Sequence, residues 1–142
     1  MRGFSLLEIL LSLALFAVLF GVGAPLLSGA YADFSLRSEE ARFVNFLRRA
    51  EHFAFSNVGE SPHGVSLQPD SFVLFRGSSY VSRESEYDEV YERSSRLSFS
   101  GPSEIIFSQR SGFPLAASDW LLTQGDIQVG NVRVNAYGAI FW

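Results

Sequence analysis

Residues 9–32 read ILLSLALFAVLFGVGAPLLSGAYA and contain no charged side chain. As an α-helix, this stretch would be about 36 Å long at ~1.5 Å per residue, and the hydrocarbon core of a bilayer is roughly 30 Å thick. Its apolar residues occur on all sides of such a helix, rather than in the single stripe that packs on a soluble core. We therefore expect a membrane-spanning helix over residues 4–32, kinked at Pro25 because proline removes a helical hydrogen bond.

Residues 33–58 predict an amphipathic continuation of the same helix. No proline or glycine lies between Tyr31 and Asn57. Apolar side chains recur there at helical spacing, at Phe43, Phe46, Leu47, Ala50 and Ala54. The helix is expected to end at residues 57–59, because asparagine and glycine favour the left-handed conformation of a C-cap and Pro62 follows.

Residues 59–142 predict an antiparallel β head. Short apolar segments alternate with glycine- and proline-containing turns at a spacing typical of hairpins, at 65–67, 72–75, 97–99, 105–107, 120–122, 127–129, 132–134 and 139–142. The polar segment 78–95 is expected to be a loop or a short helix. Tyr87, Val90 and Tyr91 would share one face of such a helix. The oppositely charged pairs Glu89–Arg93 and Glu92–Arg96 would lie at i,i+4. The predicted fold class is α+β, with a long N-terminal helix packed on an antiparallel β-sheet or β-sandwich.

The composition excludes several kinds of chemistry. The chain has 142 residues, no cysteine and no lysine, so disulfides, thiolate metal sites, Schiff bases and a P-loop lysine are ruled out. A net charge of -4 provides no positive field that would collect nucleic acid. His52 and His63 form no metal-binding motif, and the acidic segment 84–92 lacks the central glycine of a calcium loop. We expect no enzymatic activity, no cofactor and no metal.

The first eight residues, MRGFSLLE, place an isolated acidic side chain at the edge of the apolar stretch. An ionised carboxylate inside hydrocarbon costs several kcal/mol unless it is paired. After Glu8, the next basic residue is Arg37, which is far out of reach along a helix. Glu8 is therefore expected to pair with Arg2, with solvent, or with a group from another molecule.

The sequence GFSLLE at residues 3–8 resembles the cleavage and methylation site of type IV prepilins and of the pseudopilins of type II secretion. The resemblance implies that a prepilin peptidase cleaves after Gly3, which makes residues 1–3 a leader, and then methylates the new N-terminus at Phe4. It also implies that Glu8 pairs with the ammonium group of a neighbouring subunit when the helices pack into a filament. Such a pair would offset the burial of both charges. Pro25 matches a proline that is common in the helix of this family.

The C-terminal residues resemble the GspH/FimT group of minor pseudopilins, in which a long helix packs under a β-sandwich-like head. The resemblance rests on EIIFS at residues 104–108, on Gly112 and on the short strands of residues 132–140. It implies a filament subunit of a type II secretion system, inserted once in the cytoplasmic membrane with its head outside the cytoplasm. Its partners would be the prepilin peptidase, other pilins or pseudopilins, and the inner-membrane assembly platform. Ala139 stands where the group usually has an arginine, which disfavours DNA binding.

Other interpretations of the same residues stay open. A minor pilin of a type IV pilus or competence pilus would use the same motif and helix. A secretory signal peptide would be cleaved after Ala32, because residues 30–32 read AYA. A plain membrane anchor would keep Glu8 at the interface and would carry an extracytoplasmic β-domain that binds a ligand.

Overall fold

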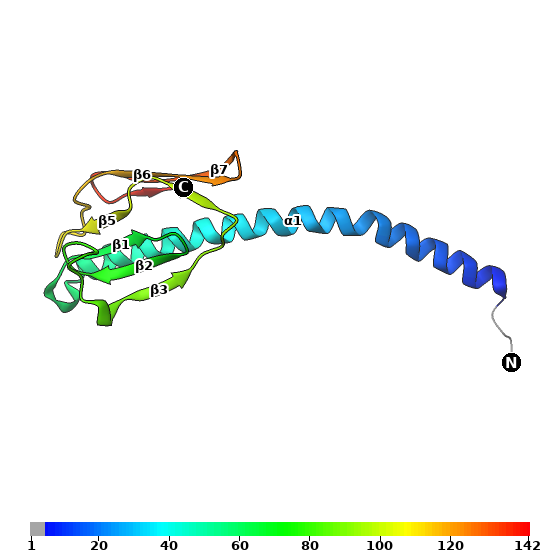
Figure 1. The fold of residues 1–142 in the computed structure, drawn as a ribbon, viewed down its shortest axis with the longest axis horizontal. Helices are drawn as coiled ribbons and strands as arrows, with labels where there is room; N and C mark the ends of the chain where they lie inside the picture. The colour runs from blue at the N-terminus through cyan, green and yellow to red at the C-terminus, as the bar shows by residue number, and fades with distance from the viewer. Residues whose placement is uncertain (1–4) are drawn as a thin grey trace. The chain divides into compact units, whose positions relative to one another are not determined.

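The computed structural model describes the backbone of residues 5–142 and the side chains of residues 5–21 and 37–142. Within these residues the chain is α+β: one long helix, α1 (Leu6–Phe55), packs on antiparallel β-sheets (Figure 1). At that level the predicted fold class is confirmed. The chain divides into two compact units, with the boundary between Ser35 and Leu36. Residues 36–142 are called the C-terminal unit below.

Helix α1 ends close to where its sequence predicts. Its last residue is Phe55, and Asn57 adopts the left-handed conformation with a φ of 55°. The Asn57 N–H donates to the carbonyl oxygen of Ala54 at 3.1 Å, which closes the last turn. The helix assignment is continuous through Pro25, whose side chain lies outside the described residues, so the kink expected there stays a prediction.

Two four-stranded antiparallel sheets make up the rest of the C-terminal unit. The first has the order β3-β2-β1-β5, and its strands are β1 (His63–Leu67), β2 (Ser71–Arg76), β3 (Glu89–Glu92) and β5 (Glu104–Phe107). The second has the order β4-β6-β7-β8, and its strands are β4 (Ser98–Ser100), β6 (Ser118–Gln124), β7 (Ile127–Val134) and β8 (Ile140–Phe141). Two short 3-10 helices, η1 (Val58–Glu60) and η2 (Ser85–Tyr87), lie in the connections.

One hydrophobic core joins the C-terminal half of α1 to both sheets. Four of the five apolar helix residues that the sequence predicts to face inward are fully buried, and Phe46 packs against them while half-buried. Phe43 lies between the sheets: its ring centroid is 4.9 Å from that of Phe72 in β2 and 5.2 Å from that of Trp120 in β6. Such contacts between large apolar side chains explain why the helix and the two sheets form one unit.

The segment 78–95 departs from its predicted structure in part: it contains the short 3-10 helix η2, but residues 89–92 form strand β3. The expected helical pairs Glu89–Arg93 and Glu92–Arg96 do not form. Instead, Glu89 binds Arg49 of α1 at 2.6 Å, and the Arg93 guanidinium donates to the carbonyl oxygen of Pro69. These partners are distant in sequence, so tertiary contacts override the local helical pattern.

Strand β7 also departs from its predicted form, which was two segments separated by Gly130. It is one strand through Gly130, with a register shift opposite Leu122 and Thr123 of β6. Gly130 pairs with Leu122 and Gln128 pairs with Thr123, so Val129 is the extra residue of a β-bulge. The glycine therefore marks an irregularity within a strand rather than a turn.

No helix within the described residues is both long enough and apolar enough to span a membrane. The expected membrane-spanning segment, residues 4–32, includes Phe4 and the side chains of residues 22–32, which lie outside the described part of the chain. The expected leader, residues 1–3, lies outside it too.

Candidate assembly helix and surface sites

The first turn of α1 gives Glu8 a local role that was not predicted. The helix begins at Leu6, which makes Ser5 the N-cap and Glu8 the third helical residue. The Ser5 hydroxyl oxygen accepts a hydrogen bond from the Glu8 N–H at 3.3 Å. Serine followed three residues later by glutamate is the pattern of a capping box, and an acidic side chain in the first turn complements the helix dipole. The spacing S-x-x-E before an apolar run is a sequence signal for this cap.

The surroundings of Glu8 contain no cation within its own stretch of helix. Residues 5–21 include no arginine, lysine or histidine, so the carboxylate has no basic partner among them. One turn along, the Ser12 hydroxyl donates to the Glu8 carbonyl oxygen at 2.7 Å, which satisfies that polar side chain within the helix. Glu8 is therefore the only charged side chain of residues 6–21, and no side chain of opposite charge lies among them.

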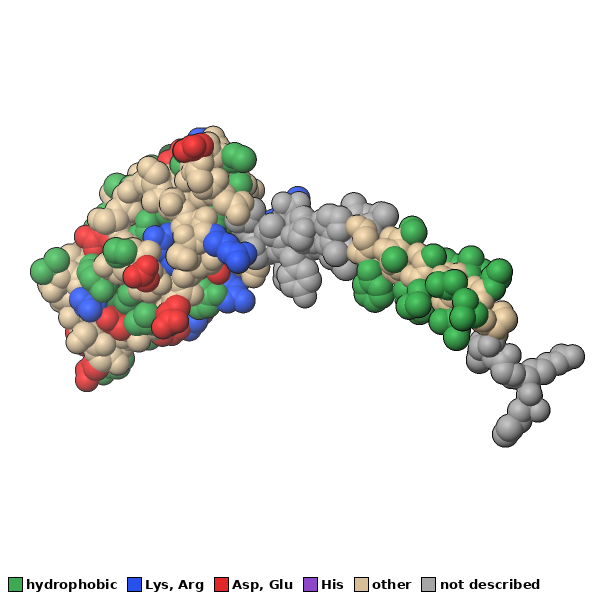
Figure 2. Space-filling model, turned by 45° about the vertical axis from the view of Figure 1, so that its right-hand side comes forward, with side chains coloured by type: hydrophobic (Ala, Val, Ile, Leu, Met, Phe, Trp, Pro, Cys, Tyr) green, Lys and Arg blue, Asp and Glu red, His purple; other side chains and the backbone are tan. Residues whose placement is uncertain are grey.

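The described N-terminal part of α1 is apolar and exposed on all sides. Exposure of its large hydrophobic side chains runs from 51% at Ile9 to 77% at Leu6. Figure 2 shows these side chains covering this part of the helix. The rings of Phe16 and Phe20 stack at 6.4 Å, but they do not shield the helix from solvent. A continuous apolar surface of this kind marks a site of contact with lipid or with other polypeptides.

Two of the four predicted site residues, Gly3 and Phe4 of the expected cleavage and methylation site, lie outside the described residues. Pro25 is placed only as part of the α1 backbone, whereas Glu8 is described in full.

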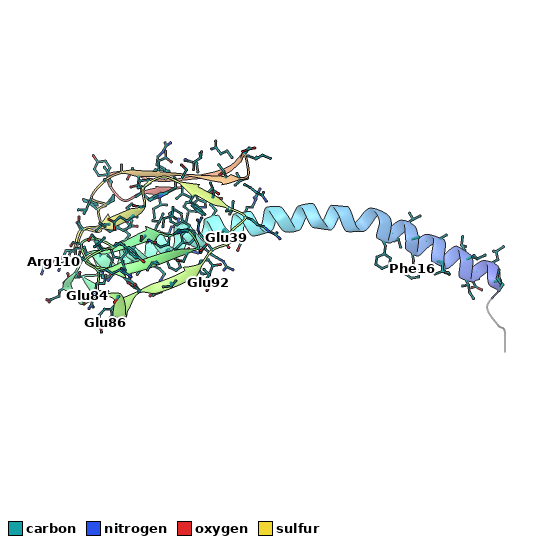
Figure 3. All side chains as sticks on the ribbon, in the orientation of Figure 1. Phe16, Glu39, Glu84, Glu86, Glu92 and Arg110 are labelled. Carbon is teal, nitrogen blue, oxygen red and sulfur yellow. The ribbon has the colours of Figure 1, made fainter. Side chains whose placement is uncertain are left out.

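The acidic segment 84–92 binds arginine side chains and is spread along the sheet edge. Glu84 pairs with Arg76, and Asp88 accepts a hydrogen bond from Arg83 at 2.7 Å. Figure 3 shows Glu84 and Glu86 at one end of β3 and Glu92 at the other. Within residues 5–21 and 37–142, no group of three or more histidine, aspartate or glutamate side chains is arranged to hold a metal ion. Three carboxylates of the segment, those of Glu84, Asp88 and Glu89, are paired with arginine side chains.

The two histidines lie in different environments and form no common site. His52 is exposed on α1, whereas His63, the first residue of β1, is 3% exposed. The His63 ring packs edge-on against Phe53 at 5.6 Å, and its Nδ1 lies 3.1 Å from the Ser61 carbonyl oxygen. Burial lowers the pKa of His63 below the ordinary value of 6.5, and the Arg76 guanidinium acts in the same direction. The hydrogen bond to Ser61 and the Glu84 carboxylate oppose this shift without reversing it.

Acid is expected to destabilise the C-terminal unit through His63. The pKa of His63 is lower in the folded protein than in the unfolded chain, so the unfolded chain binds a proton at this histidine first as the pH falls. The stability that the neutral His63 allows is therefore fully present above about pH 6.5 and is lost as the pH falls below that value. Glu40 and Glu51 act in the opposite direction, since burial raises their pKa values above 4.5. Urea unfolding of the wild type and of His63→Gln at pH 7 and pH 5 should therefore show that the free energy of unfolding falls less in the variant. An equal fall in both proteins would contradict this role of His63.

The C-terminal residues contact the outer face of α1. The Arg48 guanidinium lies 4.4 Å from the ring centre of Trp142, which is 58% exposed. Arg133 hydrogen-bonds Asp119 at 3.2 Å, so its charge is partly neutralised.

The chain was compared with models of known families, with curated proteins and with solved structures, and it matches none of them.

Proposed function

We propose that this chain is a structural filament subunit, a minor pseudopilin of a type II secretion system. Prepilin peptidase cleaves it after Gly3 and methylates Phe4. The apolar part of α1 inserts in the cytoplasmic membrane as a single pass, with the C-terminal unit outside the cytoplasm. The assembly platform then moves the subunit into a filament of other pilins or pseudopilins, in which the role of this chain is structural and not enzymatic.

The observation that carries this proposal is α1 itself. A single helix of 50 residues has an apolar, exposed surface over its described N-terminal part and a half-polar C-terminal part that packs on both sheets. A helix that is apolar on all sides needs lipid or other helices around it. The motif at residues 3–8 leads directly into this helix and supports the same role.

The place of Glu8 in the first turn supports its pairing with a new N-terminus. Cleavage after Gly3 would leave an ammonium group on Phe4, directly before the N-cap Ser5. That positive charge would lie at the positive end of the helix dipole, which disfavours it. The Glu8 carboxylate of a neighbouring subunit would offset this charge and fix the axial position of the two helices.

The N-terminus of the mature protein tests this proposal. The membrane-extracted chain, co-expressed with a prepilin peptidase, is expected to begin at N-methylated Phe4 when analysed by mass spectrometry. The matched control is Gly3→Val, which should remain uncut because the peptidase is expected to require the small residue.

Other N-termini would contradict the proposal in different ways. A chain that begins at Asp33 would have carried a secretory signal peptide, and an uncut chain would be a plain anchor for an extracytoplasmic β-domain. A minor pilin of a type IV or competence pilus would share the methylated Phe4. Co-purification with type II secretion subunits rather than with pilus subunits separates those two systems.

A further inference from the structure

Strand β7 is paired on only one side over most of its length. Strand β6 pairs with it from Ser118↔Val134 to Gln124↔Ile127, whereas β8 pairs only with Arg133 and Val134. Within the described residues, 127–132 therefore has no strand beside it on the β8 side. Figure 1 shows the β6–β7 hairpin extending past the C-terminal end of the chain. An unpaired strand edge presents backbone donors and acceptors that can template a further strand.

The hydrogen-bond alternation of β7 identifies which residue offers these groups. The Asn135 N–H donates to the Ala139 carbonyl oxygen at 3.0 Å, and Arg133 lies opposite Phe141. In an antiparallel pair, every second residue directs both backbone groups to the same neighbour. Asn131 is the next residue in this series, and no residue of β8 lies opposite it. Its N–H and C=O therefore point to the open edge.

A groove of about 490 Å³ lies beside this edge. Glu40 of α1 lines it together with Gly130, Asn131 and Arg133 of β7 and with Trp142. A Cβ atom at Gly130 would lie only 2.6 Å from Oε1 of Glu40, so the glycine is what allows the carboxylate to lie against the strand. The Glu40 carboxylate therefore lies in the groove beside the β7 backbone.

The groove contains two charged side chains, Glu40 and Arg133, and Arg37 precedes Glu40 by three residues on α1. The Glu40 carboxylate is partly buried, and that burial raises its pKa above 4.5, although Arg37 lowers it in part. The neighbouring Arg133 is bound to Asp119 instead. Within the described part of the chain, Glu40 takes part in none of the ion pairs. A cationic side chain from outside would complement it.

Exposed apolar side chains flank the edge and complete the surface. They are Ile127, Val129, Phe141 and Trp142, with exposed fractions from 37% to 70%. An added strand would place alternate side chains against these residues. Large aromatic side chains such as Trp142 contribute strongly to binding when a partner buries them.

We propose that the open edge of β7 binds an extended segment of another polypeptide as an added strand, with a lysine or arginine side chain of that segment paired to Glu40 in the groove. This partner site goes beyond the filament role and does not depend on it, because it lies entirely in the C-terminal unit. The backbone edge gives affinity for any extended segment, and the carboxylate selects the cationic one.

Fluorescence anisotropy with a labelled synthetic peptide tests the proposal on the full chain in non-ionic detergent. The probe is a peptide of about nine residues that alternates valine and threonine around a central lysine. We expect saturable binding below about 1 mM. A peptide with glutamate at the centre should bind more weakly, and a peptide with N-methylated backbone amides should not bind. Absence of saturable binding by the lysine peptide, or equal binding by the N-methylated one, overturns the proposal.

Two protein variants assign the binding to this edge. Asn131→Pro removes the N–H at the open edge and should weaken binding at least about fivefold. Its matched control, Asn131→Ala, loses the same side-chain hydrogen bond to Asp119 but keeps the N–H, so it should bind like the wild type. The Glu40→Gln variant should bind the lysine peptide no more tightly than it binds the same peptide with glutamine at its centre. Unchanged binding by a folded Asn131→Pro, or unchanged discrimination by Glu40→Gln, contradicts the proposal.

A second copy of this chain is the competing occupant of the edge. Sedimentation of the protein alone over a range of concentrations detects it. We expect that Asn131→Pro does not change the degree of self-association of the protein. If the protein forms a dimer and Asn131→Pro abolishes it, the edge binds a second copy of this chain, and the proposal of a separate partner segment is overturned. Should Asn131→Pro fail to fold, the N-methylated peptide still decides whether binding uses the backbone edge.

Discussion

Replacing Glu8 with glutamine is expected to abolish incorporation of this chain into filaments while leaving its N-terminal processing intact. Removing one partner of a buried ion pair costs about 3–5 kcal/mol, which corresponds to a loss of about a hundredfold or more in association. The measurement is the amount of mature chain in sheared filaments from cells that contain the prepilin peptidase and the sibling subunits. Mass spectrometry of the membrane fraction checks that the variant still begins at Phe4.

The control for Glu8→Gln is Ser5→Ala. The Ser5 hydroxyl caps the helix by accepting the Glu8 N–H, and loss of such a cap costs about 0.5–2 kcal/mol of helix stability. Ser5→Ala therefore weakens the helix terminus but keeps the carboxylate, so it should assemble nearly as the wild type does. If Glu8 acts only on its own helix, Glu8→Gln should have an equally small effect, because an acidic side chain in the first turn contributes about 0.3–1 kcal/mol. Equal assembly of the two variants would contradict intersubunit pairing.

The features that depend on nearby residues could be predicted from the sequence. The end of α1 depends on the conformational preference of Asn57, which lies two residues beyond the last helical residue. The inward face of the helix follows from the spacing of Phe43, Leu47, Ala50 and Ala54, all of which are buried. The capping role of Ser5 could also be predicted, because it requires only the spacing to Glu8. The expectation for Glu8 concerned only the partner of its charge and not that of its backbone N–H.

The features that depend on distant residues could not be predicted. Strand β3 forms because Tyr91 stacks on Phe72 of β2 at 6.3 Å and Glu89 binds Arg49 of α1. Neither partner is visible from the segment itself, whose pattern also suits a helix. The sheet order has the same origin: β4 pairs with β6 and β5 pairs with β1, so two successive strands belong to different sheets.

The groove beside β7 shows why a site of this kind escapes sequence analysis. It combines Glu40 of the helix with Gly130 of a strand that lies 90 residues further along the chain. Gly130 predicts a turn when only its neighbours are considered. Its actual place, within a bulged strand against the Glu40 carboxylate, follows from how the second sheet packs on α1.

Trp120→Ala is expected to cause the largest loss of stability in the C-terminal unit. Trp120 is 1% exposed, packs edge-on against Phe43 at 5.2 Å, and donates from Nε1 to the Pro102 carbonyl oxygen at 2.8 Å. Truncation of a buried tryptophan costs about 3–5 kcal/mol because it leaves a cavity. The unpaired carbonyl adds to this loss when it stays buried. Urea unfolding followed by far-UV circular dichroism in non-ionic detergent measures the change in the free energy of unfolding.

Two further variants separate the causes of that loss. Trp120→Phe keeps most of the apolar volume but removes the indole N–H, so it should lose only the hydrogen bond and a small cavity, well below the effect of alanine. Trp142→Ala removes the other tryptophan of the chain, whose ring is exposed and contacts Arg48, and should change stability by no more than about 1 kcal/mol. A core that is shared by the helix and both sheets requires this order of effects. If Trp120→Ala reduced the free energy of unfolding as little as Trp142→Ala, the second sheet would not depend on its packing against α1. The place of Glu40 of α1 beside β7 would then have no support from the core.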